Sequence, residues 1–172
     1  WINFLGDGPP ALALALDSSK SVLLEPPRAP KAPLLEPVAA RFVIGDGLVK
    51  GGLGLSLLLI LPSLGVGTLA TATAVFFYEG VAKLLSMFPA RRLGGTLRPN
   101  RWVLAATVAS IALQLACIGL PPLREMMGLT VLGALPLVVV TLALLSTYLL
   151  GELLLHVLRA PRQGSRLVGL RT

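Results

Sequence analysis

Residues 42–61 read FVIGDGLVKGGLGLSLLLIL, an apolar run in which only Asp46 and Lys50 carry charge. A helix needs about 20 predominantly apolar residues to cross the hydrocarbon core of a bilayer. Because Asp46 and Lys50 stand four residues apart, they share one face of a helix, and we expect them to neutralise each other near the membrane interface. The run therefore predicts a membrane-spanning helix with an internal ion pair.

Similar apolar runs recur along the chain. With 55% hydrophobic residues and a mean hydropathy of +0.82, the 172 residues are far more apolar than a soluble domain of this size. Breaks rich in Pro, Gly or Arg separate the runs, which cover residues 42–61, 66–88, 102–120 and 130–158. This pattern predicts an all-α, polytopic helical membrane protein. Its expected parts are a broken helical stub at 1–16, a Pro-rich loop at 17–41, a four-helix transmembrane region at 42–158 and a basic tail at 159–172.

The basic residues indicate the orientation in the membrane, because Lys and Arg accumulate in short cytoplasmic loops. The segments 17–41, 89–101 and 159–172 each hold several of them, whereas the opposite side holds only Arg124. We therefore expect an integral, multi-pass protein whose loop at 17–41, tail and carboxy terminus are cytoplasmic. The net charge of +7 is distributed between apolar runs and not over one soluble face, so nucleic acid is not an expected partner.

The first residues, WINFLGDGPPALAL at 1–14, contain the most informative candidate site. Asn3 and Asp7 are four residues apart and so share a helical face. The Gly-Pro-Pro sequence after Asp7 interrupts the backbone, which at membrane depth is tolerated only in a segment that is buried in protein or lines a polar cavity. Freed carbonyls and a carboxylate would suit a hard cation. Alternatively, Asp7 caps a surface turn, since Gly-Asp-Gly-Pro is common turn chemistry, and the residues alone leave both interpretations open.

This stretch resembles the sixth transmembrane helix of the P-type cation-transporting ATPases. The calcium-pump-like branch has the pattern Trp-hydrophobic-Asn followed by Asp-Gly-hydrophobic-Pro-Ala, and the Asp-Gly-Pro-Pro form is similar to that of secretory-pathway calcium/manganese pumps. Residues 26–34, PPRAPKAPL, resemble the cytoplasmic loop that follows this helix in the family, although Glu25 stands where Arg or Lys is usual. Without the resemblance, these residues would be interpreted as a polyproline linker. The resemblance implies half of the sixth helix plus the seventh to tenth, with Asn3 and Asp7 as ligands of the transported ion.

Glu79 lies well inside the second apolar run, where a carboxylate is costly and suggests function. By the resemblance it matches a glutamate of the eighth helix that completes one of the two calcium sites in sarcoplasmic-reticulum-type pumps. Lys83, one turn later, offers a structural ion pair instead. Gly6 replaces the threonine that serves the same site, so a single ion site is an open alternative to two. The predicted metal ligands are thus Asn3, Asp7 and Glu79.

Glu152 and His156 lie four residues apart near the end of the last run. This spacing could bind a metal or move a proton. We favour interface anchoring and a local hydrogen bond. The sequence from Gly151 to Leu154 is also similar to the end of the tenth helix in calcium pumps, which supports the register.

The residues and the resemblance predict the transmembrane, ion-binding part of a P-type ATPase that transports a divalent cation, calcium or else manganese. The family's Asp-Lys-Thr-Gly-Thr phosphorylation motif and nucleotide domain are not in this sequence, so no ATPase activity is expected from this chain alone. No cofactor is expected in the chain itself; ATP and Mg²⁺ would act only through those domains.

The expected partners are the lipid bilayer, the remaining helices and cytoplasmic domains of a pump, and the divalent cation. The alternative is a noncatalytic small membrane subunit or a truncated-gene product that packs against other transmembrane helices. A start in the middle of a helix predicts a longer natural chain, whereas a small subunit should begin with Met and an intact first span.

Overall fold

A computed structural model of the protein describes residues 8–15, 35–93 and 100–159. Within these ranges every regular element is an α-helix, and no strand occurs. The predicted all-α class is therefore confirmed. The helices are α1 (Gly8–Ala15), α2 (Pro37–Ser63), α3 (Thr68–Leu93), α4 (Arg101–Gly119), α5 (Pro121–Met126) and α6 (Ala134–Arg159).

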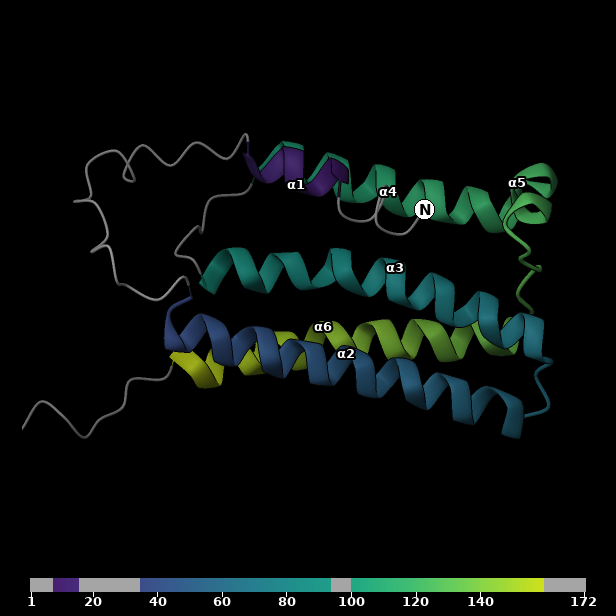
Figure 1. The fold of residues 1–172 in the computed structure, drawn as a ribbon, viewed down its shortest axis with the longest axis horizontal. Coiled ribbons are helices and arrows are strands. Elements are labelled where there is room, and N and C mark those ends of the chain that lie inside the picture. Colours follow the sequence, from purple (N-terminus) through teal and green to yellow (C-terminus); the bar gives the residue numbers. More distant parts are fainter. Residues whose placement is uncertain (1–7, 16–34, 94–99, 160–172) are drawn as a thin grey trace, which may run out of the picture.

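The four long helices lie side by side, with α3 in the middle (Figure 1). On one side α3 packs against α2 and α6, which also contact each other. On the other side it packs against α4, and α1 lies along α4. α3 consequently has protein neighbours on both sides.

The long helices differ in how apolar they are. α2, α4 and α6 are long and apolar enough to cross a membrane. α3 has a comparable length of 26 residues but is more polar and is not among them, although the sequence predicted four spans. The difference arises because α3 carries Thr, Tyr, Glu, Lys and Arg residues. A helix between protein neighbours can carry such side chains because they face the bundle interior instead of lipid.

The hydrophobic core lies where α2, α3 and α6 meet. The core combines leucines of α2 with residues of α3, of α6 and of the segment just before α6, and the small residues among them let helices approach closely. The core residues are Leu57, Leu61, Ala74, Tyr78, Ala82, Leu132, Val140 and Ala143. The outward faces carry many exposed Leu, Val and Ile side chains. Because lipid tails are as apolar as Leu, a bilayer suits these faces.

α2 is longer than the predicted run at 42–61. Pro37 occupies its first turn, where the missing N–H and the fixed φ of proline are tolerated. At the other end the helix continues through Pro62 to Ser63, into the break that we predicted at 62–65. The chain turns at Gly65, whose φ of +79° is readily adopted by glycine. α2 and α3 thus form a helical hairpin, and its turn lies at the α3 side of the break that separates the two runs.

α3 also extends beyond its predicted end at residue 88. It runs through Pro89 to Leu93 and so takes in part of the segment that we expected to be a loop. Arg91 and Arg92 consequently lie in its last turn, where positive charge complements the helix dipole.

The connection between α4 and α6 is more ordered than the sequence indicated. The Pro-Pro pair at 121–122 ends α4, as expected, and also begins α5, since proline fits a first turn. α6 begins at Ala134 and not at the predicted residue 130. The backbone N–H of Thr130 donates to the Thr73 hydroxyl of α3 (3.1 Å), which fixes the connection against the bundle.

Candidate cation site and its polar support

Glu79 lies near the middle of α3, and its carboxylate is directed at α2. The Oε1 atom of Glu79 is 2.5 Å from the position that a Cβ atom would occupy at Gly54. Gly54 is buried and Glu79 is half-buried. Carboxylate oxygens are ligands that hard divalent cations prefer. The arrangement therefore places one potential ligand between two packed helices.

Glu79 forms no ion pair with Lys83 within the described ranges. The ion pairs found there, Lys50 with Asp46 and one between α3 and α6, involve other residues. The structural pair that the spacing of Glu79 and Lys83 allowed is therefore not formed among these residues.

Asn3 and Asp7 lie outside the described residues, so the structure does not bring them together with Glu79. The described chain begins at Gly8, and α1 packs along α4 and buries Ala13. The described ranges hold no group of three or more His, Cys, Asp or Glu residues that could bind a metal. The roles of Asn3 and Asp7 as ligands stay predictions.

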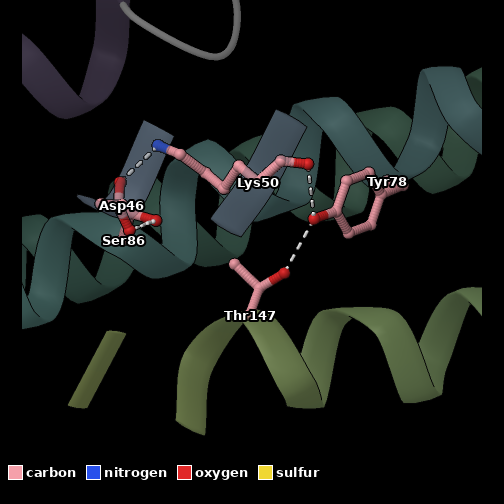
Figure 2. A network of polar contacts seen from close by, with 5 residues as sticks. All are labelled: Asp46, Lys50, Tyr78, Ser86 and Thr147. Carbon is pink, nitrogen blue, oxygen red and sulfur yellow. Dashed lines mark hydrogen bonds and ion pairs between the residues drawn. The ribbon is translucent and has the colours of Figure 1, made fainter. Parts of the chain in front are cut away.

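A polar network joins α2, α3 and α6 (Figure 2). Asp46 is buried; its Oδ2 atom lies 2.7 Å from Lys50 Nζ, and its Oδ1 atom accepts a hydrogen bond from Ser86 Oγ at 2.9 Å. The predicted pairing of Asp46 with Lys50 is confirmed. Together Lys50 and Ser86 offset the cost of burying a charged carboxylate.

Tyr78, the residue before Glu79, completes this network. It is fully buried, and its hydroxyl donates to the Lys50 carbonyl oxygen of α2 (3.2 Å). The same hydroxyl is hydrogen-bonded to Thr147 Oγ1 of α6 (2.9 Å), as Figure 2 shows. These bonds tie α3 to both neighbours and restrict its rotation at the candidate ligand.

A second ion pair joins α3 and α6 near their carboxy-terminal ends. It links the Arg92 guanidinium to the Glu152 carboxylate. We expected Glu152 to bond locally with His156, but the described residues show no such bond and His156 is exposed. The expectation was wrong. The sequence predicted that this run ends at residue 88, whereas α3 continues to Leu93 and brings the Arg92 side chain to α6.

α4 has a buried polar face. Thr107, Ser110 and Gln114 are buried along it at helical spacing. The amide of Gln114 lies directly against Gly80 of α3, and neither its nitrogen nor its oxygen has a hydrogen-bond partner among the described residues. A side chain at Gly80 would collide with this amide, so glycine permits the contact.

Sequence reasoning missed Tyr78, Ser86 and Thr147. The sequence does contain a signal for them, because each is a hydroxyl residue inside an apolar run. Tyr78 and Ser86 are also eight positions apart, which places them on one helical face. Their partners depend on which helices are neighbours, and spacing within one helix does not reveal that.

In the described residues, membrane-length helices pack around paired polar groups and the half-buried carboxylate of Glu79, an arrangement that fits an integral, multi-pass membrane protein. The chain belongs to the P-type cation-transporting ATPases: the family model described as "Cation transporting ATPase, C-terminus" matches residues 1–157. The predicted resemblance to the carboxy-terminal region of these pumps is thereby confirmed.

Among curated proteins, the chain is similar to the mouse (Mus musculus) "Calcium-transporting ATPase type 2C member 2". The two are 29% identical over 162 residues, which cover 90% of this chain and 17% of the relative. The human and rat proteins with this name are 29% and 28% identical over the same length. The chain thus spans 17% of the length of the curated relatives that it matches.

Proposed function

We propose that this chain is the ion-binding membrane part of a P-type ATPase that transports a divalent cation, calcium or else manganese. The observation that carries the proposal is the Glu79 carboxylate, which lies inside the bundle without an ion pair in the described ranges. An ionised group at membrane depth is costly unless another charge balances it. Family membership and the names of the curated relatives support calcium as the cargo.

Asn3 and Asp7 are the proposed further ligands. Both precede α1, and an amide oxygen, a carboxylate and the carbonyls of an interrupted backbone are ligands that calcium accepts. The site would draw its ligands from two segments, one before α1 and one in α3. Bound calcium or manganese would be cargo, and not a resident cofactor.

Other parts of the pump would supply the energy. Phosphorylation and the binding of ATP and Mg²⁺ belong to cytoplasmic domains that this sequence does not contain. The residues of this chain would bind the cation and release it when the helices move. Its partners would be those domains, the remaining transmembrane helices and the bilayer.

The carboxy-terminal end of α6 faces the cytoplasm in this proposal. The end of α3, the start of α4 and the end of α6 lie at one end of the bundle (Figure 1) and carry Arg91, Arg92, Arg101 and Arg159. At the opposite end, α5 carries Arg124. This asymmetry supports the orientation because short cytoplasmic loops are rich in Lys and Arg.

Replacing Glu79 by Gln in the complete pump polypeptide tests the proposal. The calcium concentration that half-activates phosphorylation from ATP should rise about tenfold or more, because a neutral amide holds a divalent cation less tightly. Asp7→Asn should either raise this half-activating calcium concentration as well or abolish calcium-dependent phosphorylation from ATP. Titrating manganese in parallel identifies the preferred cargo.

Glu152→Gln is the matched control, because this carboxylate is already paired with Arg92. Its half-activating calcium concentration should equal that of the unmodified pump, with protein amounts compared by immunoblot. An unchanged calcium dependence in both Glu79→Gln and Asp7→Asn would contradict the ligand assignment.

A further inference from the structure

Gly54 of α2 is the residue against which the Glu79 carboxylate rests. A Cβ atom at Gly54 would lie 2.5 Å from Glu79 Oε1, 3.4 Å from Tyr78 Cε1 and 3.7 Å from Glu79 Cδ. Real Cβ atoms essentially never approach another heavy atom within 3.0 Å. A side chain at this position would therefore displace the carboxylate or push α2 away from α3.

Most other glycines in this part of α2 do not have this role. A Cβ atom at Gly47, Gly51 or Gly52 would meet nothing within 4 Å. At Gly45 it would meet the end of the flexible Leu154 side chain, at 2.7 Å. Gly54 is distinct because the group it admits is a carboxylate.

The backbone on either side of Glu79 is held in place, so α3 has little freedom to rotate and carry the carboxylate away from Gly54. Tyr78 is hydrogen-bonded to the Lys50 carbonyl, one turn before Gly54 on α2, and to Thr147 on α6. On the other side, Gly80 lies directly against the Gln114 amide of α4. Rotation of α3 would break the first contact or worsen the second.

We propose that Gly54 and Tyr78 are positioning residues of the cation site. Gly54 leaves the space in which the Glu79 carboxylate rests on the α2 backbone, and Tyr78 fixes the rotation of α3 that points the carboxylate there. α2 thus forms one wall of the site without contributing a ligand side chain. The inference rests on the proposed function of Glu79 as a ligand.

Gly54→Ala in the complete pump tests this role, and the substitution favours helix formation, so α2 itself is not weakened. The half-activating calcium concentration should rise by about two- to tenfold, which lies in the lower part of the coupling range for residues in contact. The maximal level of phosphorylation at saturating calcium should stay near that of the unmodified pump. Gly52→Ala, the same change at a position with open space, is the control and should leave both quantities unchanged.

The same substitution in a Glu79→Gln background separates positioning from a general effect on the fold. If Gly54 acts through Glu79, Gly54→Ala should add less than about a twofold shift there, because the coupled group no longer binds the cation. Equal shifts in both backgrounds, or no shift in either, would overturn the inference. Tyr78→Phe should shift the calcium dependence in the same direction as Gly54→Ala, and this shift should also disappear in the Glu79→Gln background.

Failure of this inference and failure of the proposed function give different results. If Glu79→Gln alone changes the calcium dependence and Gly54→Ala does not, Glu79 is a ligand and Gly54 does not position it. If Glu79→Gln alone has no effect, the ligand assignment fails and the positioning roles fail with it.

Discussion

Asp46 carries a carboxylate into the interface of α2 with α3 and α6, and it has two partners there. Lys50 supplies the opposite charge from one turn away on the same helix, and Ser86 donates a hydrogen bond from α3. A buried charge that loses its partner costs far more than an intact pair contributes. The three side chains therefore behave as a unit.

Replacing Asp46 by Ala should lower the free energy of unfolding by about 1–3 kcal/mol, because the Lys50 ammonium and the Ser86 hydroxyl lose their partner. The effect falls below that of a fully enclosed pair, since the Lys50 side chain keeps 22% of its surface exposed. Denaturant unfolding in detergent measures it. The double variant with Lys50→Ala should recover part of the loss, and strictly additive losses would show that the two residues are not coupled.

The sequence predicts local polar contacts better than those between helices. The Asp46–Lys50 pair follows from a spacing of four residues. The Tyr78–Thr147 bond joins residues 69 positions apart, and no periodicity within one helix indicates it. For the same reason the sequence indicated the wrong partner for Glu152: we expected His156 on the same helix, and the structure shows Arg92 of α3.

Among the helices, α3 is the most polar of the long ones and also the most enclosed. Its neighbours on both sides shield side chains that lipid would not tolerate. The long helices could be predicted from the length of the apolar runs, but several boundaries could not. Proline was read as a break, whereas Pro37 and the pair at 121–122 occupy first turns, where proline is compatible with a helix.

The contact between α3 and α4 depends on the absence of a side chain at Gly80. Gly80→Ala should destabilise the bundle by about 1–3 kcal/mol, because the new methyl group would force the Gln114 amide and α4 outward. Unfolding in detergent tests this, with Gly52→Ala as a control in which a methyl group meets open space. Adding Gln114→Ala should restore stability. A double variant no more stable than Gly80→Ala alone would place the strain elsewhere.

In the described bundle, polar groups such as Asp46, Thr147 and Gln114 are buried together with the apolar core, and many large apolar side chains face outward. This distribution suits a protein whose solvent is lipid, as the composition of the sequence indicated. The candidate site could be predicted in part: Glu79 lies inside the bundle, but only the packed helices reveal that Gly54 faces its carboxylate. Asn3 and Asp7 stay predictions from the motif and the resemblance.

The size of the native polypeptide tests whether this region acts within a longer pump. An immunoblot of source membranes with an antibody against residues 162–172 should show a band several times heavier than 18.0 kDa, because the chain matches 17% of its curated relatives. A band near 18.0 kDa would instead favour a separate small subunit or a truncated-gene product.

The bond between Tyr78 and Thr147 also bears on how the protein is made. Synthesis runs from the amino terminus, so α2 and α3 leave the ribosome before α6. Until α6 enters the membrane, the Tyr78 hydroxyl has the Lys50 carbonyl as a partner but not Thr147. A chain whose translation stopped before residue 134 would therefore contain the candidate ligand without the helix that completes its support. Cellular quality control would meet α2 and α3 with part of their polar interface left without α6.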